Sequence, residues 1–168
     1  MKEYLLFDIE TNGFKPDTIF MIVITNLFTK ERQTYIGLDE IALAISRLMD
    51  ARMLVGHGIK KFDIPVIQKL SGATFDAILV DTVEMSRDLC NLRKNGLEAW
   101  GEMVGLPKLP SPDFTQMTPE MIPYCERDVD LNVLVFETLV EVLLETNQDK
   151  PYTGIINEYV DNKLKCLV

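Results

Sequence analysis

Three consecutive segments with strand character fill the first 37 residues, and this feature constrains the fold more than any other. Residues 3–9 form an apolar run that ends in acids, and residues 18–25 and 32–37 are rich in β-branched and aromatic side chains. Asn12-Gly13 and the Thr-Lys-Glu triplet at 29–31 are turn signals between them. The pattern predicts a three-stranded meander.

Strand and helix patterns alternate after this meander. Hydrophobic spacing and short apolar runs predict a helix from residue 39, a strand at 53–55, a helix at 62–70, a strand at 78–80, and helices at about 82–90 and 95–104. The Pro-rich segment 106–114 is expected to be a surface loop. Together these patterns predict one α/β domain.

The C-terminal part contains the longest predicted helix. Thr118 has the character of an N-cap with Pro119 at the first helical position, and the helix is expected to run to about Glu145. Pro123 is expected to distort or restart the first turn. We predict a main domain at residues 1–146 and a C-terminal tail at 147–168, which either covers the sheet or docks a partner.

Composition places the chain among ordinary globular proteins. With 168 residues, 47% of them hydrophobic and 26% charged, the chain is long enough to bury one core. It opens on no leader pattern and contains no apolar run of membrane-spanning length. Cys90, Cys125 and Cys166 are odd in number and form no CxxC pair, so we expect neither disulfides nor a zinc site. A cytoplasmic location follows as the expectation, the host cytoplasm if the chain is viral.

Two acids close the first strand segment. Asp8 and Glu10 are two residues apart, so the repeat of a strand points both carboxylates to one side while Ile9 faces the other. A strand that leaves a core often becomes polar at its end. The pair therefore has an ordinary structural explanation when it is taken alone.

Two helical segments supply further acids. Asp63 follows Phe62 at the start of a helix, where the helix dipole favours a carboxylate by roughly 0.3 to 1 kcal/mol. Tyr124 and Asp128 are four residues apart, which places both on one face of the last long helix. Each position again has a structural explanation. Their order along a single α/β chain is what indicates a common site.

These motifs resemble those of a known superfamily. Asp8-x-Glu10, Phe62-Asp63 and Tyr124-x-x-x-Asp128 are similar to the three exonuclease motifs of DnaQ-like 3′-to-5′ exonucleases of the four-carboxylate (DEDD) class, in the tyrosine branch. The resemblance spans most of the chain. It is strongest to the exonuclease domains of phage family A DNA polymerases, through the flanking sequences Asp81-Thr82, Ser86-Arg87 and Leu97-Glu98-Ala99-Trp100-Gly101.

The resemblance implies both a fold and a metal site. The fold would be RNase H-like, a mixed five-stranded sheet flanked by helices, and the site would bind two divalent ions, Mg²⁺ or Mn²⁺, about 3.5 to 4 Å apart. Asp8 would contact both ions, Glu10 and Asp128 would complete the first, and Asp63 would hold the second. Tyr124 would orient the attacking water, and the product would be a nucleoside 5′-monophosphate.

Substrate contacts are expected beside these acids. By the same resemblance, the residues after the first motif would lie next to the terminal nucleotide: Thr11, Asn12 and Gly13. Phe14 would stack on a base, a contact worth ~1 to 3 kcal/mol per base; the alternative is a polar turn with one buried aromatic. His57 would contact a nucleotide or serve as a hydrogen-bonded structural residue. Phosphate contacts, or alternatively plain solvated surface, are expected of Lys60, Lys61, Arg93 and Lys94.

The chain departs from the family pattern at one position. Relatives usually carry Asn a few residues before the Phe/Tyr-Asp pair, whereas Gly58 stands there, after His57. One polar contact to substrate or to a metal-bound water is thereby put in doubt. The histidine branch of the superfamily would need His near Pro123, and His57 is the only histidine in the chain, so the tyrosine branch is the one available.

The net charge bears on whether nucleic acid would be bound by a basic face or through metal ions. The formal charge of −9 argues against a long basic face that neutralises many phosphates. Two divalent ions on four carboxylates would change it to −9 + 4 = −5 and would supply positive charge where one phosphate must lie. The acidity therefore fits metal chemistry at a strand end better than a tight grip on a duplex.

Three functions remain open on sequence. The leading hypothesis is a stand-alone metal-dependent exonuclease that degrades single-stranded DNA from the 3′ end and proofreads for a separate DNA polymerase, because its look-alikes are fused to one. The first alternative is a 3′-to-5′ RNA exonuclease, since nothing in the sequence reads a 2′-hydroxyl. The second is a non-catalytic polymerase-binding module that keeps the fold.

Overall fold

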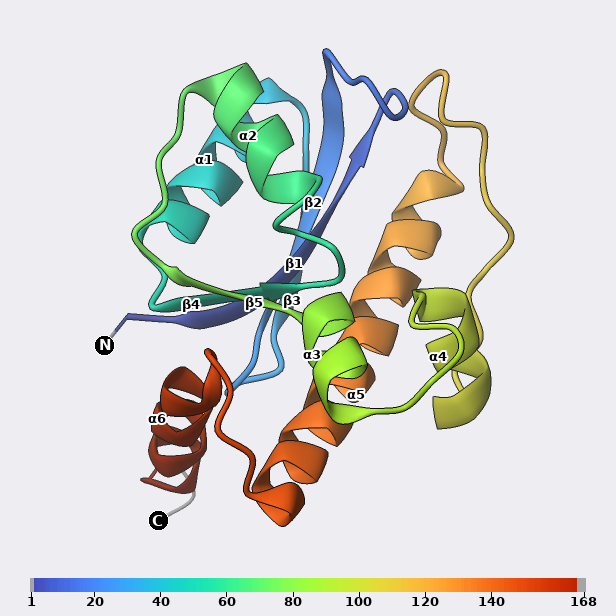
Figure 1. Cartoon of the computed structure of the whole chain (residues 1–168). Coiled ribbons are helices and arrows are strands. Elements are labelled where there is room, and N and C mark those ends of the chain that lie inside the picture. The colour runs from blue at the N-terminus through green and yellow to red at the C-terminus, as the bar shows by residue number, and fades with distance from the viewer. Residues whose placement is uncertain (1, 166–168) are drawn as a thin grey trace.

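A five-stranded mixed sheet forms the centre of the protein (Figure 1). The computed structural model describes residues 2–165. The strands are β1 (Tyr4–Thr11), β2 (Ile19–Asn26), β3 (Arg32–Ile36), β4 (Met53–Gly56) and β5 (Ile78–Asp81). Their order is β3-β2-β1-β4-β5, with β1, β2 and β3 antiparallel and β4 and β5 parallel to β1. The predicted meander and the predicted mixed five-stranded sheet are confirmed.

Helices cover both faces of this sheet. One face carries α1 (Leu38–Met49) and α2 (Asp63–Ser71); the other carries α3 (Thr82–Leu89), α4 (Leu97–Val104), α5 (Met121–Thr146) and α6 (Thr153–Lys165). Successive side chains of β1 point to opposite faces of the sheet, so each residue packs against the helices on one face only. Phe7 and Ile9 pack under α1 and α2, whereas Leu6 packs under α5. Asp8 and Glu10 share the side of Leu6.

The start of α5 differs from the prediction. The helix begins at Met121 rather than after Thr118, and the hydroxyl of Thr118 is buried without a hydrogen-bond partner among the described residues. Pro123 therefore occupies the third helical position. It does not break the helix there, because the amide that a proline lacks has no intrahelical partner in the first turn.

Segment 105–120 connects α4 to α5 without a helix or a strand, as predicted for its Pro-rich part. Two backbone contacts attach it to the helices. The amide of Leu106 donates to the carbonyl of Gly101 at 2.9 Å, and Arg127 donates to the carbonyl of Pro107 at 3.0 Å. The segment is thereby held along one side of α5.

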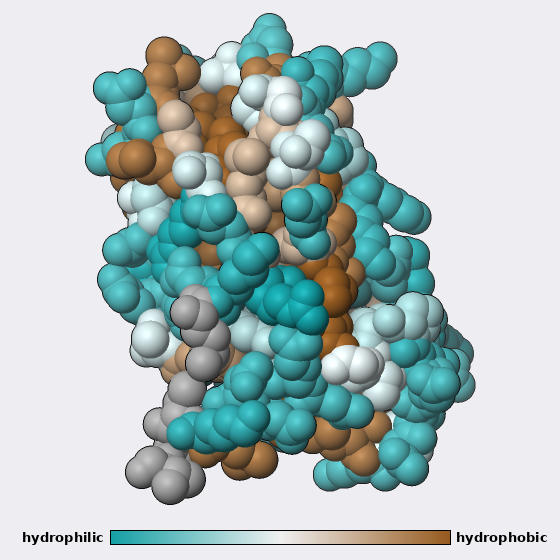
Figure 2. Space-filling model, turned by 90° about the vertical axis from the view of Figure 1, so that its left-hand side faces the viewer, coloured by the Kyte–Doolittle hydropathy of each residue, from teal (hydrophilic) through white to brown (hydrophobic). Residues whose placement is uncertain are grey.

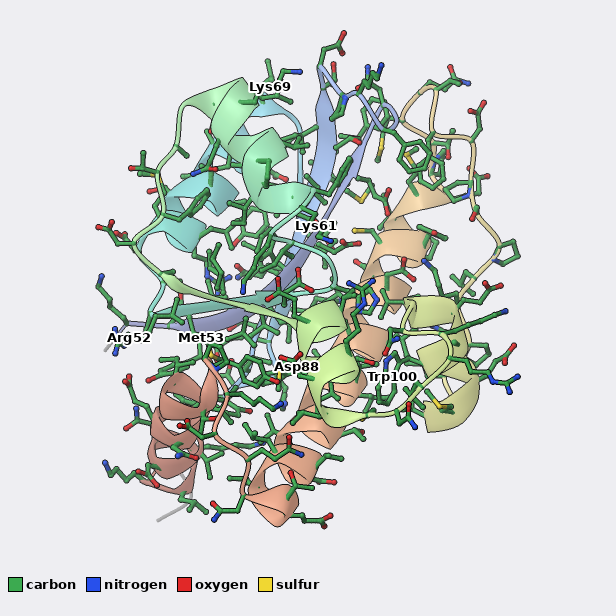
Figure 3. The ribbon with its side chains drawn as sticks, in the orientation of Figure 1. Arg52, Met53, Lys61, Lys69, Asp88 and Trp100 are labelled. Carbon is green, nitrogen blue, oxygen red and sulfur yellow. The ribbon has the colours of Figure 1, made fainter. Side chains whose placement is uncertain are left out.

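The C-terminal helix α6 packs into the same core as α5. Tyr159 is 2% exposed and stacks on Phe28, with ring centroids 5.4 Å apart, and Tyr4 and Phe136 complete the aromatic cluster. Arg52, which directly precedes β4 and lies above α6 in Figure 3, forms an ion pair with Glu158 of this helix. The boundary that we predicted at residue 146 remains a prediction, as does a docking role for the tail.

The surface carries a shallow apolar groove of about 630 Å³ between α1 and α2. Apolar side chains gather in the upper half of the face that bears these helices (Figure 2). Between residues 2 and 165, no helix combines the length and the hydropathy that crossing a membrane requires. Cys90 and Cys125 are free thiols, and Cys166 lies outside the described residues.

Candidate active site

The candidate site lies where β1 extends past its parallel neighbour. β4 pairs with β1 only up to Leu6, whereas β1 continues to Thr11, so the later residues of β1 have a free edge. Asp63, the first residue of α2, uses this edge: its Oδ1 accepts a hydrogen bond from the amide of Ile9 at 3.3 Å. An acid from the α1–α2 side of the sheet is thereby attached to the strand that carries Asp8 and Glu10.

Helix α5 brings the remaining acid to the same place. Cys125 directs its thiol to Asp8, with 3.8 Å between Sγ and Oδ2, and one ligand atom from each of Asp8, Glu10 and Cys125 lies within 4.8 Å of the other two. Asp128 follows Cys125 by about one helical turn, and its charge acts on both Asp8 and Glu10. The structure thus assembles the four acids that the sequence singled out.

Burial makes this cluster electrostatically unfavourable when it holds no cation. Glu10, Asp63 and Asp128 are each less than a tenth exposed. Burial, reinforced by the charge of Asp128, raises the pKa of Asp8 to about 7; burial and the charges of Asp8 and Asp128 raise the pKa of Glu10 to about 9. Burial also raises the pKa of Asp63 well above its usual value.

The donor set fits a hard divalent cation. Carboxylate oxygens are the ligands that Mg²⁺ and Mn²⁺ prefer, and Oδ1 of Asp128 is buried without a hydrogen-bond partner among the described residues. The thiol of Cys125 does not belong to this set, because burial raises its pKa well above the usual value and keeps it protonated. Asp8, Glu10, Asp63 and Asp128 are the groups suited to hold the metal.

Tyr124 precedes Asp128 by one helical turn and is 7% exposed. The ring of Phe114 meets the ring of Tyr124 edge-on, with 5.8 Å between the centroids. The ammonium of Lys108 lies 4.9 Å from the centroid of the same ring. Segment 105–120 therefore supplies contacts that limit the motion of Tyr124.

Lys108 is the site residue that sequence reasoning missed. Its Nζ lies 2.6 Å from Oδ2 of Asp128, and its side chain is only 25% exposed. The contact with Asp128 outweighs burial and raises the pKa of Lys108 above its usual value. No sequence signal distinguished this lysine from the others, because it belongs to a loop without periodicity.

Among the comparisons with known proteins, the similarity to solved structures is informative about the fold. Neither a known protein family nor a curated protein matches the sequence. Among solved structures, the apo form of a nuclease superposes with a TM-score of 0.73 and 19% identity, over 98% of this chain and 84% of that one. Brucella melitensis NrnC bound to pGG gives 0.71 and 16%, over 99% and 86%, and NrnC has also been solved with bound Mg²⁺.

Escherichia coli RNase D, an exoribonuclease involved in structured RNA processing, gives a TM-score of 0.64 and 13% identity. The match covers 98% of this chain and 45% of RNase D. The chain has an RNase H-like fold. At these identities the likeness establishes the fold, and the chemistry must be argued from the site itself.

In this RNase H-like fold, Asp81 shapes the turn that leads to Asp63. Its Oδ1 accepts hydrogen bonds from the amides of Gly58 at 3.0 Å and Val83 at 2.9 Å, and its Oδ2 accepts one from the amide of Lys60 at 3.2 Å. Asp81 thus joins the start of α3 to the turn before α2. This arrangement gives a structural role to the Asp81-Thr82 sequence.

His57 is held by the neighbouring threonine. Its Nδ1 lies 2.9 Å from Oγ1 of Thr82, and the same hydroxyl lies 2.8 Å from Oδ1 of Asn132 on α5. Burial lowers the pKa of His57 to about 4, so the ring is neutral near pH 7. Of the two expectations for His57, these contacts favour the hydrogen-bonded structural residue.

The residues expected to contact substrate in the loop between β1 and β2 differ in their surroundings. Asn12 is engaged within the loop, where its side chain bonds to the carboxylate of Asp17 and to the amides of Asp17 and Thr18. Thr11 is buried and donates to the carbonyl of Gly13 at 3.0 Å. Phe14 is 98% exposed, so the alternative of a polar turn with a buried aromatic is wrong.

Basic and aromatic residues gather beside this loop. A depression of about 350 Å³ is lined by Phe14 and Lys15 from the loop and by Lys61, Phe62 and Lys69 from the region of α2. Lys61 precedes α2 and Lys69 lies near its end, so the two lysines mark the length of the helix (Figure 3). Lys60, in contrast, is paired with Glu84 at 2.6 Å.

Proposed function

We propose that this chain is a metal-dependent 3′-to-5′ exonuclease of the tyrosine branch, which hydrolyses single-stranded DNA ends to nucleoside 5′-monophosphates. One observation carries the proposal: four acids from β1, α2 and α5 converge at the free end of β1, with Tyr124 one turn from Asp128. Buried acids that repel one another oppose folding unless protons or cations neutralise them, and divalent cations do so at sites of phosphoryl transfer.

Two Mg²⁺ or Mn²⁺ ions are the cofactors that we propose. Asp8, Glu10, Asp63 and Asp128 would hold them, in keeping with the Mg²⁺ bound in NrnC. Bound divalent ions supply positive charge for the phosphate and make a water molecule more acidic. The protein contributes the placement of the acids, the exclusion of bulk water from them, and the phenol of Tyr124, which would orient the attacking water.

The proposed strand path follows the depression beside α2. Phe14 presents a free aromatic face on which a base can stack, and Lys61 and Lys69 are positioned for phosphates. This small basic patch suits a few nucleotides at a strand end rather than a long duplex, in agreement with the net charge of −9. Proofreading for a separate DNA polymerase is the role that we propose for such an activity.

RNA is the alternative substrate. It is favoured by the similarity to RNase D, an exoribonuclease, whereas the residues beside the depression offer stacking and charge, which do not distinguish ribose from deoxyribose. A polymerase-binding module is the remaining alternative. The apolar groove between α1 and α2 is the observation that favours it, since an exposed apolar surface of this kind can bind a protein.

The decisive experiment uses 5′-labelled single-stranded DNA and RNA of one sequence, each with Mg²⁺, Mn²⁺ or chelator. We expect a ladder that shortens from the 3′ end with metal and disappears with chelator or with Asp8→Ala. Asp39→Ala, which removes an exposed acid on α1, is the matched control and should retain activity. Intact oligonucleotides under all conditions would overturn the proposal and favour the binding module, and a faster RNA ladder would favour the RNA exonuclease.

A further inference from the structure

Lys108 brings a positive charge into direct contact with the acid cluster. Within residues 2–165, it forms the only ion pair with any of the four acids, at 2.6 Å from Asp128. The same ammonium lies over the ring of Tyr124, 4.9 Å from its centroid, so it contacts the two α5 residues that the proposed function assigns to metal and water. The position is therefore one from which a cation can act on the reaction.

The backbone beside Lys108 is fixed, which leaves the side chain as the part that can move. Gly101 permits the approach of segment 105–120: an added Cβ at Gly101 would lie 2.8 Å from the carbonyl oxygen of Leu106 and 3.1 Å from Cα of Pro107. Arg127 binds the carbonyl of Pro107 from the other side. Trp100, which points from α4 toward α3 and donates to Ser86 at 3.0 Å, holds α4 itself (Figure 3).

The formal charge of the site indicates that Lys108 also has a role when metal is bound. The four acids and Lys108 sum formally to −4 + 1 = −3, and two divalent ions would change this to −3 + 4 = +1. The single positive charge that remains matches the single negative charge of a phosphodiester. In addition, a divalent ion at Asp128 repels the ammonium from Oδ2.

We propose that Lys108 exchanges partners, pairing with Asp128 in the metal-free site and binding the phosphate of the terminal nucleotide once metal occupies the acids. This inference rests on the proposed function and adds a substrate-binding residue to it. In the metal-free protein, Lys108 reduces the net negative charge of the cluster. In the loaded protein, it donates hydrogen bonds to a phosphate oxygen from the α5 side, opposite the depression beside α2.

The test compares Lys108→Met with Lys108→Arg and with Lys30→Met as the matched control. Lys30 also pairs with a glutamate, Glu137, far from the acids. Calorimetric titration of the substrate-free proteins with Mg²⁺ is the first measurement. We expect Lys108→Met to bind Mg²⁺ about tenfold more tightly than wild type, because a competing charged hydrogen bond is removed.

The second measurement is the binding of a nucleoside 5′-monophosphate to the Mg²⁺-saturated proteins, together with their turnover of single-stranded DNA. Lys108→Met should bind the nucleotide about tenfold more weakly and turn over more slowly, and Lys108→Arg should recover part of both. A lysine that only braces the loop would leave nucleotide affinity unchanged or weaken Mg²⁺ binding, and either result overturns the inference. Failure of wild type to cut DNA or RNA would instead overturn the proposed function.

Discussion

At the scale of single residues, the acid cluster opposes folding in the absence of metal. The pKa values of Asp8 and Glu10 are raised to about 7 and about 9, so near neutral pH the ionised forms exist at a cost to the folded state. The thiol of Cys125 and the ammonium of Lys108 contact the cluster, and between residues 2 and 165 only Lys108 brings a compensating charge to it. The residues proposed for chemistry are thus among the least favourable for stability.

Asp8→Asn should abolish activity and yet stabilise the metal-free protein. The amide keeps the size of the carboxylate and removes one charge from the cluster, so we expect a gain of about 1 to 3 kcal/mol in the free energy of unfolding near pH 8. Urea unfolding in chelator measures it. A loss of stability would show that the carboxylate of Asp8 is needed for folding rather than for metal.

The stability of the metal-free protein should also depend on pH. Because both pKa values lie above those of the unfolded chain, the folded state binds more protons between about pH 4 and the raised values, and stability falls as pH rises through this window. The slope is up to about 1.4 kcal/mol per pH unit for each group. Urea titrations between about pH 5 and 9 should show this fall, and saturating Mg²⁺ should reduce it. A flat profile in chelator contradicts the raised pKa values.

Gly58 stands where the exonuclease motif that the sequence resembles usually carries Asn, and the backbone conformation at this position is one that both residues can adopt. Its φ is +82°, in the left-handed region that glycine and, among other residues, asparagine adopt most easily. No atom lies within 4 Å of an added Cβ. Glycine at this position is therefore compatible with the backbone of the turn before Asp63.

Gly58→Asn should consequently fold with a loss below about 1 kcal/mol, whereas Gly58→Ala should lose about 1 to 2 kcal/mol. The difference isolates backbone strain, since both side chains enter open space. Urea unfolding compares the two variants, and 3′-end cleavage shows whether the added amide restores a substrate contact. Equal losses in both variants would mean that the left-handed conformation is unimportant at this turn.

At the scale of elements, the packing of α4 determines where segment 105–120 begins. Trp100 and Gly101 are neighbours on α4 and make different contacts. The indole of Trp100 donates a hydrogen bond to Ser86 of α3, and the lack of a side chain at Gly101 lets the backbone of Leu106 and Pro107 pack against α4. The Leu97-to-Gly101 sequence therefore helps to position the segment that passes beside the candidate site. Two residues after Leu106, the chain reaches Lys108.

Gly101→Ala should displace this segment and disturb the site. The new methyl group would meet backbone atoms at 2.8 and 3.1 Å, and we expect a stability loss of about 1 to 3 kcal/mol with a larger loss of activity than of folding. Gly154→Ala is the control, since nothing lies within 4 Å of its added Cβ and alanine favours helix α6. Thermal unfolding and 3′-end cleavage measure both variants. Wild-type behaviour of Gly101→Ala would show that the segment is positioned by other contacts.

At the scale of the whole molecule, α6 closes the end of the core opposite the acid cluster. Ile155, Ile156 and Tyr159 are each at most 5% exposed and contact side chains from the sheet and from α5. The aromatic cluster around Tyr159 joins residues more than 150 positions apart, because Tyr4 belongs to it. These contacts favour a tail that is part of the fold.

Tyr159→Ala should therefore destabilise the protein by about 3 to 5 kcal/mol, as large truncations in a core do. Tyr159→Phe is the matched control: it removes only a hydroxyl that is buried without a partner among the described residues, so it should be neutral or stabilising. Chemical denaturation distinguishes them. A mild effect of Tyr159→Ala would support a separate tail that docks a partner instead.

Local sequence patterns were sufficient to predict most of the helices and strands and the faces of β1. Alternation along β1 placed Asp8 and Glu10 on one side, and turn residues divided the meander, because these are properties of neighbouring residues. The motif acids were singled out by their order along the chain and by the resemblance to exonuclease motifs, and their roles remain predictions. Local signals were weaker at helix ends, and the start of α5 was misplaced by the N-cap character of Thr118.

The contacts between segments far apart in the chain could be identified only in the folded protein. Three features depend on the path of loops in the folded chain. They are the pairing of Lys108 with Asp128, the hydrogen bond from the amide of Gly58 to Asp81, and the exposure of Phe14. No periodicity encodes such contacts, because a loop residue has no fixed direction relative to an element elsewhere in the chain. Periodic patterns therefore predicted the scaffold and its acids, and the folded chain alone placed a cation among them.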